Sequence, residues 1–89
     1  MKTFYVYILQ SMVDSSYYKG FSEQPFIRLG QHNNRECRFT SNKTPWKLVF
    51  MQSYSTKREA LIREKKLKKY DNSQIAQIVG SQLNELNNV

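Results

Sequence analysis

The 89-residue sequence predicts one α+β domain, in which a small three-stranded antiparallel sheet is flanked by helices in the order ββαβαα. The chain length fits a single domain. Short runs rich in β-branched and aromatic residues predict three strands within the first 54 residues. Apolar residues at helical spacing dominate the remainder. We expect the domain core over about 4–79 and a C-terminal helical tail over 80–89.

The strands follow from local composition and turn signals. Phe4–Leu9, "FYVYIL", is almost wholly apolar or aromatic, which predicts a strand buried on both faces. The Asp-Ser-Ser sequence at 14–16 is a turn signal, so Tyr17–Phe21 is expected to pair with the first strand as a hairpin. A polar, basic loop over 35–45 leads into Trp46–Tyr54, which predicts the third strand.

Three helices are predicted, over about 25–33, 57–70 and 73–86. The first begins at a proline, which suits the first turn of a helix. The second follows Thr56, and Glu59 three residues later completes a capping-box pattern. The third is amphipathic and contains Gly80, where we expect it to split.

Charge and composition limit the class of protein. Fourteen Lys and Arg against seven Asp and Glu give a net charge of +7, which favours an anionic partner, most commonly nucleic acid. The alternative is a protein that simply has a lysine-rich face. Cys37 is the only cysteine, which excludes an internal disulfide and a cysteine-based metal site. We find no signal peptide and no run of about 18 apolar residues, so no membrane partner and a cytoplasmic location are expected.

Four side chains are spaced so that they can converge. Tyr7 and Tyr18 lie on neighbouring strands of the predicted hairpin, while Arg28 and His32 are four residues apart and share a helix face. A helix packed beside the hairpin would bring all four together. A phenol or imidazole can relay a proton, and an arginine matches phosphate oxygens. This combination indicates phosphodiester cleavage.

Such cleavage usually requires a divalent metal, and Glu64 is the best ligand in the sequence. It shares a helical stripe with Ala60, Leu61 and Leu67, which we expect to face inward. A carboxylate there is costly unless it is paired or bound to a metal. The alternative is a weak ion pair with Lys68.

The segments "YVYILQS", "YYKG", "RLGQHN", "PWKLVF" and "EALIREKKLKK" together resemble the GIY-YIG nuclease superfamily. The chain is most similar to small single-domain bacterial proteins that resemble the N-terminal domain of the excision nuclease UvrC. The resemblance covers about 4–79. The two halves of the name motif are Tyr5-Val6-Tyr7 and Tyr18-Lys19-Gly20, which keep the tyrosines and the final glycine.

The resemblance implies a metal-dependent endonuclease that hydrolyses DNA phosphodiester bonds, with Mg²⁺ or Mn²⁺ as cofactor. Tyr7 is similar to the general base, and Tyr18 to the tyrosine that helps to place water and phosphate. Arg28 is similar to the arginine on the scissile phosphate. His32 matches a histidine present in several branches. Glu64 is similar to the single metal-binding glutamate.

Further residues are expected to contact nucleic acid, with DNA favoured over RNA. Gly20 would let the backbone approach the substrate closely. The complete set is Gly20, Lys19, Arg35, Arg38 and Lys43. We expect Tyr5, Tyr17 and Trp46 to pack in the core, and Glu85 to be an exposed acid.

Two alternatives remain beside an active nuclease with a role in DNA repair or recombination. One is a nucleic-acid-binding module of the same fold that is catalytically weak or inactive. The other is a protein-interaction module whose basic face meets an acidic partner. A partner protein that selects the target is compatible with the nuclease.

Overall fold

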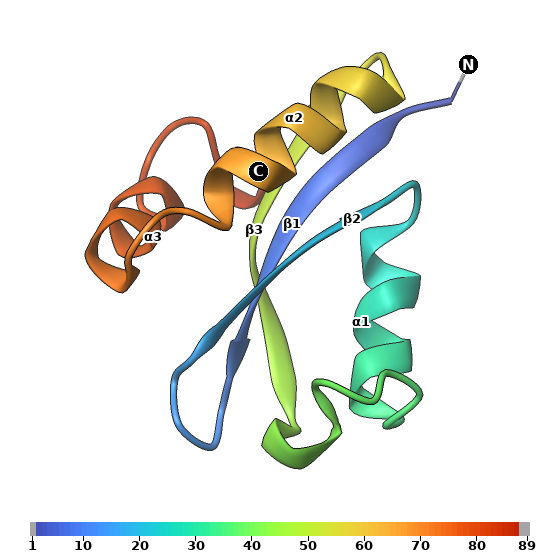
Figure 1. Ribbon diagram of the computed structural model, residues 1–89, viewed down its shortest axis with the longest axis vertical. Helices are drawn as coiled ribbons and strands as arrows, with labels where there is room; N and C mark the ends of the chain where they lie inside the picture. Colours follow the sequence, from blue (N-terminus) through green and yellow to red (C-terminus); the bar gives the residue numbers. More distant parts are fainter. Residues whose placement is uncertain (1, 88–89) are drawn as a thin grey trace.

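A computed structural model describes residues 2–87, and its element order is the one that the sequence predicts (Figure 1). The strands and helices are β1 (Phe4–Ser11), β2 (Tyr17–Ser22), α1 (Pro25–Asn33), β3 (Trp46–Tyr54), α2 (Lys57–Leu67) and α3 (Asn72–Val79). Two short 3₁₀ turns follow α1 and α3, at Ser41–Lys43 and Glu85–Asn87. The strands form one antiparallel sheet in the order β2-β1-β3, so β1 is central. The predicted α+β class and sheet are confirmed.

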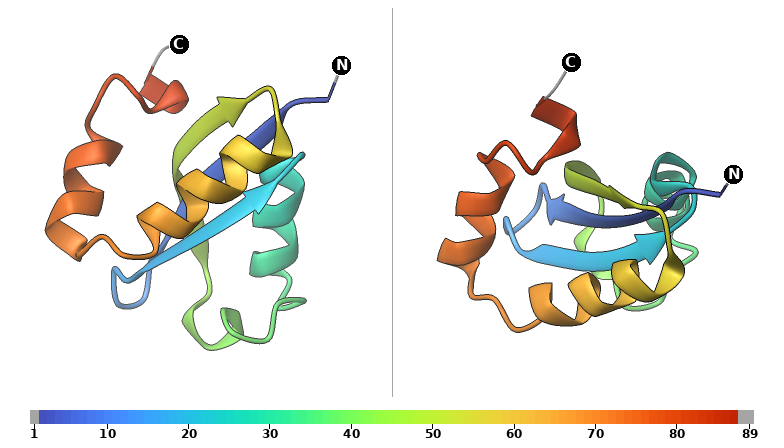
Figure 2. Two further views of the ribbon diagram at one scale, coloured as in Figure 1. Left: turned by 45° about the horizontal axis from the view of Figure 1, so that its top comes forward. Right: turned by 90° about the horizontal axis from the view of Figure 1, so that it is seen from above.

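The central strand is buried on both faces, as its composition predicts. Val6 and Ile8 point toward α2 and α3, where they pack with Phe50. Tyr7 and Leu9 point to the other face, where they pack with Trp46 and with a leucine of α1. Figure 2 shows α1 and α2 on different sides of the sheet. The alternation of side chains along β1 therefore divides the core into two layers.

Helix α2 differs from the prediction in its end and in one face. It ends at Leu67 instead of near residue 70, because Lys69 and Tyr70 donate to carbonyls three residues back and so form a tighter turn. Ala60 and Leu67 face the core, but Leu61 is 41% exposed. The expectation that Leu61 faces inward is wrong, since it lies about 100° around the helix axis from Ala60.

The C-terminal tail covers the outer edge of β3. Helix α3 ends at Val79 with Gly80 as its C-cap, at the predicted split. The prediction that the helix continues to about residue 86 is wrong, because turns follow Gly80 and lead to the 3₁₀ turn at Glu85–Asn87. Asn84 then accepts from the backbone N–H of Met51 at 3.2 Å and donates to the carbonyl of Val49 at 2.7 Å. Val49 is the extra residue at the register shift between β1 and β3. The tail thus satisfies edge groups that an open strand would leave unpaired.

Glu85 takes part in the same edge contact, so the expectation that it is an exposed acid is wrong. Its carboxylate accepts hydrogen bonds from the backbone N–H and from Oγ of Ser53. Within residues 2–87, no helix is long and apolar enough to cross a bilayer.

Candidate active site

Tyr7 and Gly20 form the centre of the candidate site. They are cross-strand partners on β1 and β2. Tyr7 is buried, and its ring lies directly over Gly20. A Cβ atom at Gly20 would lie 2.5 Å from both Cζ and Oη of Tyr7, far inside ordinary contact. The position that a side chain would take at residue 20 is therefore filled by the tyrosine ring.

His32 comes from the last turn of α1 and contacts the Tyr7 hydroxyl. Its side chain is fully buried, with Nε2 at 3.2 Å from Oη of Tyr7. Its Nδ1 lies 2.8 Å from Oγ1 of Thr40. Burial, followed by the charge of Arg28, lowers the pKa of His32 below its ordinary value. The imidazole is therefore neutral near pH 7.

Tyr18 completes an aromatic cluster at the site. Its ring centroid lies 4.8 Å from that of His32 and 6.5 Å from that of Tyr7. Trp46 closes the cluster from β3, at 6.4 Å from Tyr18. Trp46 is buried, as expected, and Tyr17 packs on the opposite face of the sheet. Tyr5 is only half-buried and lines a cavity of about 270 Å³ beside the first turn of α1.

Arg28 lies one turn before His32 on the same face of α1. Its guanidinium interacts with the Tyr7 hydroxyl and donates to Sγ of Cys37 at 3.4 Å. A further hydrogen bond to Gln31 holds the side chain. The four side chains that the spacing predicted to converge are therefore in contact.

Both site phenols hold their protons firmly. Burial raises the pKa of Tyr7 to about 12, although the Arg28 guanidinium opposes the shift. Burial also raises the pKa of Tyr18, again against the charge of Arg28, and the Glu64 carboxylate adds to the rise. Near neutral pH both side chains are therefore neutral phenols.

Glu64 approaches this cluster from α2. Its carboxylate is one of the charges that raise the pKa of Tyr18, and its side chain is only 19% exposed. The carboxylate also lies 3.7 Å from Nζ of Lys68, so the ion pair considered from the sequence forms. Among residues 2–87, no group of three or more His, Cys, Asp or Glu side chains could hold a metal. A single carboxylate fits Mg²⁺, which keeps several waters and binds through one or two carboxylates together with substrate phosphates.

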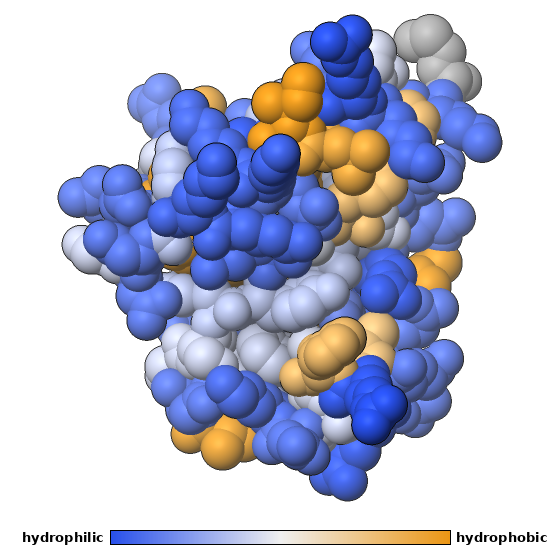
Figure 3. All heavy atoms as spheres, in the orientation of Figure 1, coloured by the Kyte–Doolittle hydropathy of each residue, from blue (hydrophilic) through white to orange (hydrophobic). Residues whose placement is uncertain are grey.

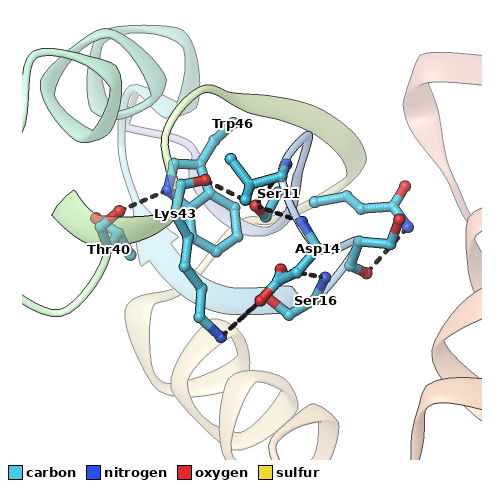
Figure 4. Close-up of polar contacts among 9 residues, drawn as sticks. Ser11, Asp14, Ser16, Thr40, Lys43 and Trp46 are labelled. Carbon is cyan, nitrogen blue, oxygen red and sulfur yellow. Dashed lines mark hydrogen bonds and ion pairs between the residues drawn. The ribbon is translucent and has the colours of Figure 1, made fainter.

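The loop between α1 and β3 supplies two site residues that sequence reasoning missed. Thr40 is buried and bonds to His32, and Cys37 contacts Arg28. Both lie in a polar segment whose residues carry no periodic pattern. The loop is held by Trp46, whose Nε1 donates to the carbonyl of Thr40 at 2.9 Å (Figure 4). No signal in the sequence distinguishes Thr40 from its polar neighbours.

The basic residues expected to contact nucleic acid lie in different settings. Arg35 and Arg38 are exposed on the loop that carries Cys37. Lys43 is paired with Asp14 at 3.2 Å, which ties this loop to the β1–β2 turn (Figure 4). Lys19 alternates with the site residues of β2 and points to the face that carries α2. Of these basic residues, Arg35 and Arg38 flank Cys37 along the chain, and Cys37 contacts Arg28.

The face of the molecule seen in Figure 3 combines a hydrophilic region with a band of intermediate hydropathy. Hydrophilic side chains gather over α2, and a pale band of intermediate hydropathy crosses the face beneath it (Figure 3). This band lies where the three strands converge in Figure 1. The band lies between α2 and the loop after α1.

Comparison with known proteins gives one consistent result. Residues 3–76 match the GIY-YIG catalytic domain. The chain is 36% identical over 75 residues to the UPF0213 protein SERP0126 of Staphylococcus epidermidis, covering 83% of this chain and 90% of that one. It is 37% identical over 78 residues to the UPF0213 protein CPE1444 of Clostridium perfringens, covering 86% and 83%.

A solved structure extends the likeness to the fold. The solution NMR structure of the UPF0213 protein BH0048 from Bacillus halodurans has a TM-score of 0.59 and 27% sequence identity. The match covers 91% of this chain and 86% of that one. The family match spans most of the chain and includes the Tyr7, Tyr18, Arg28, His32 and Glu64 positions. The chain therefore belongs to the GIY-YIG family of nuclease domains.

Proposed function

We propose that this protein is a metal-dependent endonuclease that hydrolyses phosphodiester bonds in DNA. The observation that carries the proposal is the contact of the Tyr7 hydroxyl with both His32 and the Arg28 guanidinium. A proton acceptor and a phosphate-binding cation thus share one tyrosine oxygen. The net charge of +7 supports a polyanionic substrate. We infer DNA over RNA because the sequence resembles an excision nuclease.

Each side chain has a proposed part in the reaction. The Tyr7 oxygen accepts a proton from the attacking water, which contributes about 10²- to 10⁴-fold in typical general base catalysis. Arg28 binds phosphate oxygens and stabilises the charge that develops on them. Tyr18 positions the water and the phosphate. Arg35 and Arg38 contact the nucleic acid backbone from the adjacent loop.

Glu64 is the proposed metal ligand. When bound there, Mg²⁺ or Mn²⁺ would polarise a phosphoryl oxygen and help to neutralise negative charge. Breaking the pair with Lys68 has little cost, because Lys68 is largely exposed and such pairs contribute at most about 1 kcal/mol. We further propose that target choice, and a role in DNA repair or recombination, depend on a partner protein.

One observation favours a second function, a nucleic-acid-binding module without significant hydrolysis. The Glu64 carboxylate is paired with an ammonium group in the structure. If that pair persists on DNA, metal binding is weak and the phosphate contacts remain. The two functions differ in whether Glu64 is required.

The experiment is a nicking assay on supercoiled plasmid and on branched and flapped DNA, with Mg²⁺, Mn²⁺ or chelator. Tyr7→Phe and Glu64→Gln should each lower cleavage by at least about 10²-fold. Tyr5→Phe and Glu59→Gln are matched controls on the same strand and the same helix, and should cleave as the wild type does. Metal-dependent cleavage that survives Glu64→Gln would contradict the assignment. Salt-sensitive DNA binding without cleavage of any substrate would establish the binding module instead.

A further inference from the structure

Thr40 is a buried hydroxyl with a partner on each side. The residue is 1% exposed, and its Oγ1 lies 2.8 Å from Nδ1 of His32 and 3.2 Å from the carbonyl oxygen of Cys37. The backbone N–H of Thr40 also donates to that carbonyl, at 3.2 Å. Trp46 fixes the Thr40 carbonyl from the other direction. The hydroxyl therefore has a fixed position against the imidazole.

The direction of these hydrogen bonds follows from the number of protons. A hydroxyl carries one proton, and a carbonyl oxygen can only accept. The Thr40 proton is donated to Cys37, so the Thr40 oxygen must accept from Nδ1–H of His32. In the neutral imidazole, Nε2 then has a free lone pair. That lone pair faces the Tyr7 hydroxyl at 3.2 Å, and Tyr7 is the donor.

We infer that Thr40 is a positioning residue, which fixes the tautomer of His32 so that the Tyr7 proton is directed inward onto Nε2. The Arg28 guanidinium engages one lone pair of the Tyr7 oxygen, and the other lone pair is then left for a water molecule. This inference rests on the proposed nuclease function, which leaves open how a phenol that holds its proton so firmly can act as a base.

The proton transfers balance as follows. As water attacks phosphorus, it gives one proton to Oη of Tyr7, and Tyr7 gives its own proton to Nε2 of His32. The new P–O bond forms and the bond to the leaving oxygen breaks. The leaving oxygen takes a proton from solvent, and the imidazolium returns its proton to solvent through Tyr7. The phenol never has to exist as a free phenolate.

The groups around His32 favour a neutral imidazole, which can accept a proton during the reaction. Tyr7 faces it from β1, Tyr18 from β2 and Arg28 from the preceding turn of α1, while Thr40 faces it from the loop. Burial and the Arg28 charge both favour the neutral ring. If the Thr40 hydroxyl is removed, nothing among these contacts keeps the proton on Nδ1. The Nε2–H form would then donate to Tyr7 and turn the Tyr7 proton toward the substrate.

The first test measures the tautomer directly, in the free protein without metal or DNA. His32 is the only histidine in the chain, so ¹⁵N-histidine labelling reports one imidazole in an NMR spectrum. We expect the wild type to show a protonated Nδ1 and an unprotonated Nε2. Thr40→Val, which keeps the shape but lacks the hydroxyl, should shift both signals toward a mixture. Thr40→Ser should restore them, and Thr44→Val is a matched control in the same loop.

The second test follows cleavage. Thr40→Val should lower kcat by about 10²-fold with little change in KM, and should alter the pH profile, whereas Thr40→Ser should recover most of kcat. A wild-type spectrum with the proton on Nε2 would overturn the inference, as would an unchanged tautomer in Thr40→Val. Because the spectrum is read without substrate, it decides this inference even if the chain cleaves no DNA. The wild-type spectrum also decides it if Thr40→Val does not fold.

Discussion

Replacing Gly20 by alanine tests how the tyrosine ring is seated. The new Cβ would lie 2.5 Å from Cζ and Oη of Tyr7 and 2.9 Å from Cε1. The ring would have to retreat by about 0.9 Å to reach ordinary contact, and a buried ring has little room to do so. Overpacking of this kind costs about 1–3 kcal/mol. Displacing Oη also weakens the bond to His32, which adds roughly 0.5–1.5 kcal/mol.

The predicted loss in the free energy of unfolding is therefore about 1.5–4.5 kcal/mol, or roughly 6 °C or more in Tm for a domain of this size. Gly30→Ala is the matched control, because its Cβ position has no neighbour within 4 Å apart from the adjoining residues and the backbone of its own helix. Since Gly30 lies inside α1, that change should stabilise the protein by about 0.5–1 kcal/mol. Urea unfolding followed by the fluorescence of Trp46, the only tryptophan, measures both variants.

Making Gly20→Ala in a Tyr7→Leu protein tests whether the Tyr7 ring causes the destabilisation. If the clash is with the phenol ring, Gly20→Ala should cost at least about 1 kcal/mol less in a Tyr7→Leu protein than in the wild type. An alanine at Gly20 that is neutral or stabilising in the wild type would refute the packing argument. Equal costs in both backgrounds would show that the destabilisation arises elsewhere.

Three further predictions concern the tail, the loop and the site. Asn84→Ala should lower the free energy of unfolding by about 2–3 kcal/mol, because buried edge groups of β3 lose their hydrogen-bond partner. Asn87→Ala should lower it by less than about 1 kcal/mol. Urea titrations of the two variants compare these losses. Asp14→Asn frees Lys43 and should strengthen DNA binding about two- to threefold in low salt, measured by anisotropy; weaker binding would contradict this. The pKa of His32 is lower in the folded protein than in the unfolded chain, so the unfolded chain takes up a proton at a higher pH. The free energy of unfolding therefore keeps its full value above pH 6.5 and decreases as the pH falls below that value. His32→Gln should reduce the dependence of the free energy of unfolding on pH, measured by unfolding curves between pH 7 and pH 5.

The strands and helices could be predicted from the sequence because each depends on the residues within its own segment. β1 is apolar in every position from Val6 to Leu9, and all four side chains are buried in the structure. Helix α1 begins at the proline and ends at Asn33, as predicted. The spacing of Arg28 and His32 placed both on one face, because helical periodicity does not depend on what the helix packs against.

The remaining features depend on contacts between distant segments. Thr40 and Cys37 reach the site only because Asn33 and Trp46 bond to each other across the loop and bring its ends together. Asn84 contacts β3 across more than thirty residues of sequence. Such contacts leave no periodic signal. Leu61 was misplaced because the apolar stripe of α2 is narrower than its spacing indicated.

The departures from the family motif can be understood from what each position contacts. Tyr5 stands where the motif has its first glycine, and its cross-strand partners are Ser22 and Ser53, which are small enough to leave room for a ring. Lys19 replaces an isoleucine on the face away from Tyr7.

Gly20, by contrast, is fixed by the ring of Tyr7, where even a methyl group does not fit. The packing of Tyr7 against β2 therefore explains why a glycine occupies position 20 of this chain.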